Sequence, residues 1–155
     1  MSFRNLLPRG KISEKTMQDL APVFQGEMLY KKQRYAQAVT KYKQALQNFP
    51  VGSGGRFMIY NKLGIVYEKL GQSDQAIAIY KLGAKEGSIT PFTYERLANL
   101  YIDTGNHKKA VDYCIKGLRC LKSAKTNFFQ EIYFHIILRN LRRKAKLLAW
   151  GNKKA

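Results

Sequence analysis

A pattern of large apolar and small residues recurs along this 155-residue chain at a nearly constant interval. The clearest copy spans residues 60–80, and the step from Ala76 in this copy to Ala110 in the next is 34 residues. Recurrence at a period of roughly 20 to 50 residues is the signature of a repeat architecture, in which each unit packs mainly on its neighbours. The recurrence therefore constrains the fold more strongly than the composition does.

Two short amphipathic helices are predicted within each copy. In the clearest copy, Gly71 tolerates left-handed backbone angles and is expected to end the first helix, while Ser73 is expected to cap the start of the second. Small residues at Gly64 and Ala76 lie where antiparallel helices must approach closely, so large rings fill the space around them. The residues that form the apolar faces of the two helices are Tyr60, Leu63, Tyr67, Ala76, Ile77 and Tyr80.

The same copy resembles the tetratricopeptide motif W-x2-L-G-x2-Y…A-x3-F, with tyrosine in place of the motif's tryptophan and phenylalanine. A third copy also keeps the motif, and Thr90 and Pro91 mark the start of its first helix. Its matching residues are Tyr94, Leu97, Ala98, Tyr101 and Ala110, with Cys114 in place of the last ring.

A first copy, from about residue 19 to residue 50, departs from the motif. Pro22 stands in the tryptophan position and Gln33 in the position of the turn glycine, as is typical of an edge repeat with no neighbour on one side. The resemblance covers about residues 19–124. It implies an all-α fold, an α-solenoid of three helix-turn-helix repeats with a long C-terminal capping helix.

The expected organisation follows from these boundaries. Ser13 is expected to cap a helix that begins near Glu14, and Asn127 with Gln130 is expected to cap the last helix. The segments are a basic arm over residues 1–13, repeats within 14–125 (about 19–52, 57–90 and 91–124), a capping helix over 126–150 and a basic tail over 151–155.

Charge is distributed unevenly along the chain. Lysine and arginine number 28 against 10 acidic residues, which gives a formal net charge of +18 and favours acidic partners, a polyanion or an anionic membrane surface. After Glu131 there is no acidic residue. The bases that follow it are Arg139, Arg142, Arg143, Lys144, Lys146, Lys153 and Lys154.

Neither a catalytic site nor a metal or cofactor site is predicted. The two histidines, His107 and His135, are far apart in sequence, and Cys114 and Cys120 are expected to be reduced packing residues. No apolar run has the length of a signal peptide or of a membrane span. We therefore expect a cytoplasmic protein that is not an enzyme.

By the resemblance, the first helices of the repeats would line a concave groove that binds a peptide or a helix of a partner protein, possibly an acidic one. An ordinary solvated helix surface is the alternative for any single lining residue. The groove residues that we single out are Met58, Asn61, Lys62, Ile65, Lys69, Phe92, Arg96 and Asn99.

One specialised form of this groove is improbable. Co-chaperones of this family hold the acidic tail of heat-shock chaperones with a clamp of Lys, Asn, Asn, Lys and Arg. Of the matching positions, only Arg96 agrees, whereas Glu27 would repel a carboxylate and Phe92 cannot pair with one.

The predicted last helix carries two apolar stripes. Ile132 and Ile136, with Phe128 and Phe129, are expected to pack inward on the last repeat. The second stripe and its flanking bases are expected to form a contact surface, with self-association as the first guess. Packing on the repeats and association with nucleic acid or an anionic membrane are the alternatives. This C-terminal surface comprises Phe134, Leu138, Leu141, Leu148, Arg139, Arg142, Arg143 and Lys146.

Overall fold

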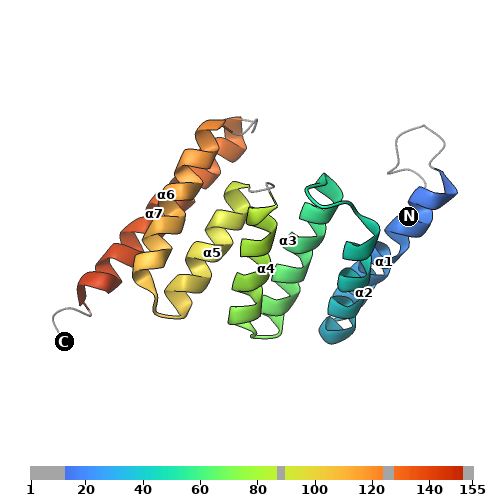
Figure 1. The fold of residues 1–155 in the computed structure, drawn as a ribbon. Helices are drawn as coiled ribbons and strands as arrows, with labels where there is room; N and C mark the ends of the chain where they lie inside the picture. Colours follow the sequence, from blue (N-terminus) through green and yellow to red (C-terminus); the bar gives the residue numbers. More distant parts are fainter. Residues whose placement is uncertain (1–12, 87–89, 124–127, 152–155) are drawn as a thin grey trace.

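The computed structural model describes residues 13–86, 90–123 and 128–151, and this part of the chain contains helices and turns without a β-strand. Figure 1 shows the helices standing side by side in a row, with the first and last of them at opposite ends of the molecule. In chain order they are α1 (Glu14–Lys31), α2 (Tyr35–Asn48), α3 (Gly54–Lys69), α4 (Ser73–Lys85), α5 (Pro91–Asp103), α6 (His107–Ser123) and α7 (Phe128–Gly151). The predicted all-α solenoid is confirmed.

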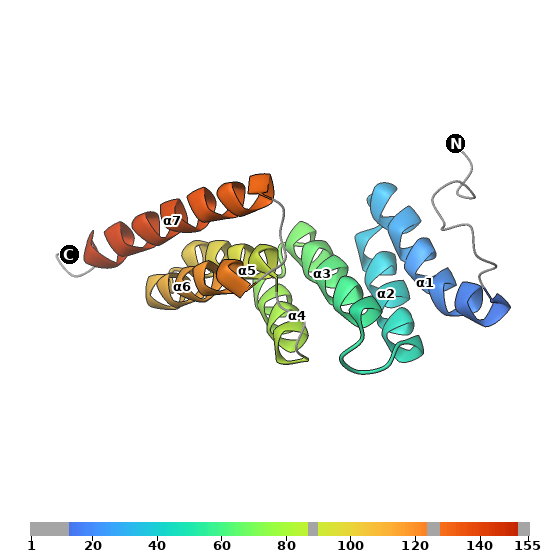
Figure 2. The same ribbon diagram turned by 90° about the horizontal axis from the view of Figure 1, so that it is seen from above.

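Consecutive helices pair as antiparallel hairpins. Helix α1 packs on α2, α3 on α4 and α5 on α6, and each pair also contacts the next one along the row. Helix α7 follows the last pair and packs on α6 and α5. Figure 2 shows α7 at the end of the row, with α5 and α6 on one side of it.

The turns inside the three pairs share one backbone conformation. Gly71 and Gly105 have φ angles of 71° and 75°, and Gln33 occupies the matching position of the first pair with φ 58°. In the second turn, the N–H of Gly71 donates to the carbonyl of Glu68 at 3.0 Å, which closes the end of α3. The predicted turn at Gly71 is therefore confirmed.

The predicted helix starts agree with the structure at two positions and fail at one. Ser13 Oγ accepts a hydrogen bond from the Thr16 N–H at 3.2 Å, as expected of an N-cap. Thr90 is the N-cap of α5 and Pro91 its first residue, although the Thr90 side chain makes no capping bond. The prediction for Ser73 was wrong by one residue, because Gln72 is the N-cap and Ser73 already lies in α4. The predicted cap at Asn127 and Gln130 lies outside the residues whose side chains the structure describes. The same holds for the predicted arm over 1–13 except Ser13, and for the predicted tail over 151–155 except Gly151.

Small and large residues interlock inside the helix pairs. A methyl group added at Gly64 in α3 would lie 2.4 Å from the Tyr80 ring of α4, closer than side chains can approach. Gly26 in α1 meets the ring of Tyr42 in α2 in the same way, at 2.7 Å. Both rings are fully buried, so each glycine provides the space that its partner ring fills.

The face that α7 turns toward the repeats is the opposite of the predicted one. Leu138 is fully buried, and its side chain packs over Gly117 of α6, where an added methyl group would lie 2.8 Å from Leu138 Cδ1. Ile136 is 55% exposed and Ile132 is also exposed. The predicted contact surface is therefore wrong for Leu138, which belongs to the core of the chain.

The other apolar members of that predicted surface differ in their burial. Leu141 is partly buried against the core and Phe134 is half-buried, whereas Leu148 is exposed. Among the bases, Arg142 is half-buried and Arg139, Arg143 and Lys146 are exposed. The bases thus remain largely on the surface, while Leu138, Leu141 and Phe134 turn toward the repeats.

Candidate functional site

Ion pairs link the first helices of the three pairs, since Glu27 of α1 pairs with Lys62 of α3, and Glu68 of α3 with Arg96 of α5. We call the side of the molecule formed by α1, α3 and α5 the first-helix face. All eight predicted groove residues lie on α3 or α5, and none of them is fully buried. Met58 and Lys69 are exposed, while the remaining six are half-buried. The structure thus places these residues together on two neighbouring helices.

A carboxylate on each of α1 and α3 links three helices. Glu27 accepts a hydrogen bond from the Tyr42 hydroxyl of α2 at 3.1 Å and pairs with the Lys62 ammonium of α3. Because these partners come from three helices, the Glu27 carboxylate joins the first pair to the second.

The same arrangement recurs one repeat later. Glu68 accepts a hydrogen bond from the Tyr80 hydroxyl of α4 at 2.6 Å, and both its oxygens bond the guanidinium of Arg96 in α5, with Arg96 Nε at 2.9 Å from Oε1. Lys62 and Arg96 are 34 residues apart and occupy equivalent positions of their repeats. We call these two groups, Tyr42–Glu27–Lys62 and Tyr80–Glu68–Arg96, the bridging triads.

Neighbouring charges shift the titration of the first triad. Burial raises the pKa of Glu27, but the hydrogen bond and the positive charge of Lys62 outweigh this effect, so the pKa lies below its ordinary value. Burial and the charge of Glu27 raise the pKa of Tyr42. Glu27 therefore remains ionised and Tyr42 neutral at physiological pH, as the pairing with Lys62 requires.

Arg56, at the start of α3, forms a third ion pair within the second repeat and a hydrogen bond to the first repeat. Arg56 Nε lies 2.8 Å from Glu86 Oε2 at the end of α4, and Arg56 Nη1 donates to the carbonyl of Leu46 in α2 at 2.6 Å. Glu86 also accepts a hydrogen bond from the Tyr60 hydroxyl at 2.6 Å. Arg56 thus satisfies a carbonyl near the end of α2 while its ion pair joins the two helices of its own repeat.

A hollow of about 160 Å³ opens on the first-helix face beside the first triad. Apolar groups and tyrosine rings from α1, α2 and α3 make up most of its wall, and the Glu27–Lys62 pair completes it. The lining residues are Glu27, Tyr30, Tyr42, Lys62, Ile65 and Val66.

Two asparagines add amide groups to the same face. Asn61 Oδ1 accepts a hydrogen bond from Thr93 Oγ1 at 3.2 Å, so its amide nitrogen is available to donate. Asn99 is half-buried, and within the described part of the chain its side chain makes no hydrogen bond. Arg96 also lies over the ring of Phe92, 5.9 Å from its centroid.

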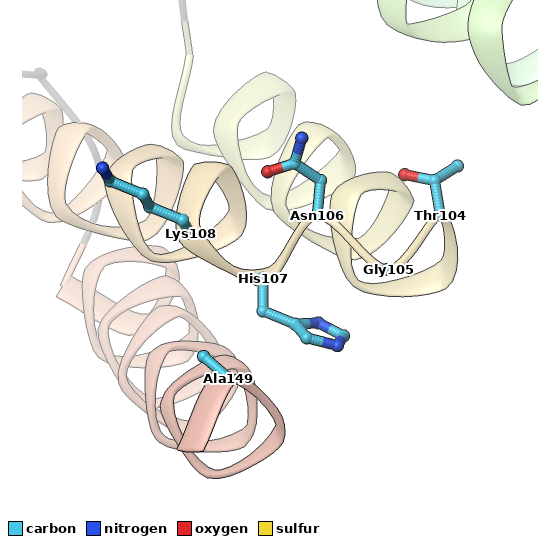
Figure 3. A pocket seen from close by; sticks show the side chains of 6 residues that line it. All are labelled: Thr104, Gly105, Asn106, His107, Lys108 and Ala149. Carbon is cyan, nitrogen blue, oxygen red and sulfur yellow. The ribbon is translucent and has the colours of Figure 1, made fainter. Parts of the chain in front are cut away.

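A wider hollow of about 390 Å³ lies between the α5–α6 turn and the end of α7. Figure 3 shows that the His107 ring points toward α7, near Ala149. Thr104, Gly105, Asn106 and Lys108 complete the lining. Across residues 13–86, 90–123 and 128–151, no group of three or more His, Cys, Asp and Glu residues could hold a metal ion.

Cys114 is buried and Cys120 is half-buried. Burial raises the pKa of the Cys114 thiol to about 11, although the charge of Arg142 opposes this shift. A thiol with such a pKa is almost entirely protonated at neutral pH and is a poor nucleophile. Cys114 therefore acts as a packing residue.

Sequence reasoning missed the bridging triads. It placed Lys62 and Arg96 in the groove as cations that would favour an acidic ligand, but each is already paired with a glutamate of the preceding repeat. The sequence did contain a sign of the triads. The first helix of repeats one and two carries a glutamate, Glu27 or Glu68, and the second helix carries a tyrosine, Tyr42 or Tyr80.

Comparison with protein families agrees with this architecture. Residues 59–85 and 93–119 match one model of the tetratricopeptide repeat, and residues 25–50 match another. This chain belongs to the tetratricopeptide repeat family. The tetratricopeptide fold is generally a non-enzymatic protein-interaction module, and the three matched segments fall in the three helix pairs.

Solved tetratricopeptide structures resemble this one in fold at low sequence identity. The Sgt2 TPR domain from Aspergillus fumigatus aligns with a TM-score of 0.67 at 15% identity, over 89% of this chain and 83% of that one. The first TPR domain of human RPAP3 gives 0.66 at 14%, over 90% and 98%. PcrH, solved in complex with the chaperone binding region of PopD, gives 0.64 at 14%, over 94% and 99%.

No curated protein matches this tetratricopeptide chain in sequence. None of the described helices has the length and apolar character needed to cross a membrane.

Proposed function

We propose that this protein is a non-enzymatic scaffold that binds an extended segment or a helix of a partner protein on its first-helix face. The hollow beside the first bridging triad is the observation that carries this proposal. It is large enough for a single aliphatic side chain, which would lie against Tyr30, Ile65 and Val66 beside the Glu27–Lys62 pair. Concave, mostly apolar surfaces with a few fixed polar groups are typical of binding sites.

The polar groups on this face favour recognition of a ligand backbone over recognition of a carboxylate. Lys62 and Arg96 are neutralised by Glu27 and Glu68, so an acidic ligand would have to displace an existing ion pair. The amide of Asn99 can donate to and accept from a peptide bond whatever the side chains of the ligand are. The expected ligand therefore offers one apolar anchor and an accessible backbone.

The structural relatives support a protein ligand. PcrH has been solved with the chaperone binding region of PopD and also with that of PopB, and its fold covers nearly the whole of this chain. A related fold thus presents a surface to a segment of another protein. We extend this mode of binding to the first-helix face described above.

A photoreactive amino acid placed at position 65 tests the proposal and identifies the partner. Ile65 lines the hollow on α3, whereas Ala78 is exposed on α4 and serves as the matched control position. The reactive group at Ile65 is expected to capture a protein that the same group at Ala78 does not. Equal capture from both positions would contradict binding at this face.

Affinity measurements with the identified partner then separate the contributions of the hollow and the amide. Ile65→Ser and Asn99→Ala are each expected to weaken binding by about fivefold to thirtyfold, because each removes an apolar contact or a hydrogen bond worth roughly 1 to 2 kcal/mol. Ala78→Ser should have no effect. Unchanged affinity in both groove variants would show that the partner binds elsewhere.

A further inference from the structure

The outward side of α7 carries apolar and basic residues in one line. This surface is separate from the first-helix face and is not used by the binding proposed there. Successive members are three or four residues apart, so they lie above one another along the helix. We call this line the outer stripe: Ile132, Ile136, Arg139, Arg143, Leu147 and Trp150. Every member is exposed, and the Trp150 side chain is 60% exposed.

The last two helices, α6 and α7, are strongly basic. Five bases lie between residues 132 and 151 of α7, and four more lie between residues 107 and 121 of α6, against the single acid Asp112. Nearly all of these bases are exposed. This excess of positive charge on α6 and α7 favours a negatively charged partner.

The order of residues along the stripe argues against a second copy of this chain. The arginines Arg139 and Arg143 lie at its centre, with apolar residues at both ends. A two-fold pairing along the whole stripe would bring these guanidinium groups against those of the other copy. Like charges at the centre of an interface are unfavourable, so self-association through α7 is not expected.

An acidic protein helix also fits the stripe poorly. The centre of a helix–helix contact excludes water, so Arg139 and Arg143 would each need a carboxylate at a fixed position to offset the loss of hydration. Ile136 and Leu147 lie on the same line and would require apolar partners one turn away. Such an interface needs one exact register along five or six turns of helix.

Binding of nucleic acid would explain the basic members of the stripe but not its apolar members. Phosphates would pair with the exposed bases, but duplex binding offers no burial for Ile132, Ile136 and Leu147. These side chains would remain in water in such a complex.

We propose that the outer stripe docks on the surface of an anionic lipid bilayer, with the axis of α7 parallel to the membrane. Arginine and lysine side chains can reach lipid phosphates through their long stems while apolar neighbours enter the acyl boundary. Anionic lipids supply negative charge along the whole helix, so no register is required. Trp150 at the end of the stripe is suited to the headgroup level, where indole rings concentrate.

The single tryptophan of the chain makes this proposal directly measurable, because Trp150 is itself a member of the stripe. The intact protein is mixed with vesicles of phosphatidylcholine and phosphatidylserine in equal amounts, or of phosphatidylcholine alone. Co-sedimentation and a blue shift of Trp150 emission are expected with the anionic vesicles and not with the neutral ones. Absence of binding to the anionic vesicles would overturn the proposal. Binding of duplex or single-stranded oligonucleotides in that case would assign the bases to nucleic acid instead.

Two charge-reversed variants test the place of binding. Arg139→Glu combined with Arg143→Glu is expected to weaken vesicle binding by at least about 25-fold, since each base near an anionic surface contributes about fivefold. Lys81→Glu combined with Lys85→Glu makes the same change in charge at the same spacing on exposed positions of α4. This control should bind close to the level of the unchanged protein. An equal loss of binding in both variants would mean that net charge alone drives binding. The assignment of membrane binding to the outer stripe would then be wrong.

A neutral variant tests insertion. Ile136→Ser combined with Leu147→Ser keeps every charge and alters only exposed side chains, so the protein should keep its helicity and melting temperature. We expect weaker binding and a smaller blue shift of Trp150. Binding and emission identical to those of the unchanged protein would show that the apolar side chains do not enter the bilayer, and the proposal would fail.

Discussion

Single glycines set the distance between the helices of a pair. The Tyr80 ring lies against the backbone of α3 at Gly64, and its hydroxyl is held by Glu68, so the ring cannot move away. The same relation between Gly26 and Tyr42 appears in the first repeat. The sequence alone predicted that a small residue is needed at Gly64, whereas the structure shows which ring, that of Tyr80, lies against it.

Gly64→Ala is expected to destabilise the protein by about 1 to 3 kcal/mol, because the new methyl group would lie 2.4 Å from the Tyr80 ring. Gly54→Ala, in the first turn of the same helix, is the matched control because nothing lies within 4 Å of the added group. Urea denaturation of both variants measures the difference. Equal stability would contradict the close contact between α3 and Tyr80.

A second residue, Gln33, holds a backbone conformation that normally favours glycine. Its φ of 58° is left-handed, whereas the equivalent turns have Gly71 and Gly105. Gln33→Gly is expected to stabilise the protein by about 0.5 to 1 kcal/mol, since a side chain at positive φ is strained. The reciprocal variant Gly71→Gln should lose a similar or larger amount. A melting temperature lowered by Gln33→Gly would show that the glutamine makes a compensating contact.

Among the elements, α7 shows where prediction from sequence ends. Both of its apolar stripes have helical spacing, so local periodicity could not decide which one faces the repeats. The inward stripe is continuous through Leu138 and Ala145, whereas the outer stripe is interrupted by Arg139 and Arg143. The face that packs inward is determined by a residue on a different helix, Gly117 of α6, because the Leu138 side chain fits against it.

Leu138→Ala is therefore expected to cost about 2 to 5 kcal/mol, because it opens a cavity where a fully buried side chain packs on Gly117. Ile136→Ala lies two residues away on the exposed face and should change the free energy of unfolding by less than about 0.5 kcal/mol. Chemical denaturation monitored by circular dichroism compares the two. A larger effect at Ile136 would restore the original assignment of the faces.

At the scale of the whole molecule, the repeat fold was predictable because its signals are local. The turn at Gly71 and the first helical residue Pro91 each depend on a few neighbouring residues. The bridging triads were not predictable, because Lys62 pairs with Glu27 across 35 positions and Arg96 with Glu68 across 28. Such pairs become neighbours only when consecutive repeats stack.

The triads predict how stability is distributed along the row of helices. Each pair contacts only its neighbours, so coupling between repeats two and three depends on a small interface that Arg96 spans. Arg96→Met is expected to cost about 2 kcal/mol, because it leaves the mostly buried Glu68 carboxylate without its paired hydrogen bonds. Lys62→Met should cost under about 1 kcal/mol, since roughly a third of that ion pair is exposed to solvent.

Native-state hydrogen exchange shows where that loss falls. Because a repeat array can open from one end, Arg96→Met is expected to lower the protection of amides in α5, α6 and α7 while α1 and α2 keep theirs. Lys62→Met acts at the preceding junction and should instead lower protection in α1 and α2. A uniform loss of amide protection over all helices in both variants would contradict this expectation. The chain would then unfold as one cooperative unit, and the two glutamate–cation pairs would stabilise the whole molecule instead of the junctions that they span.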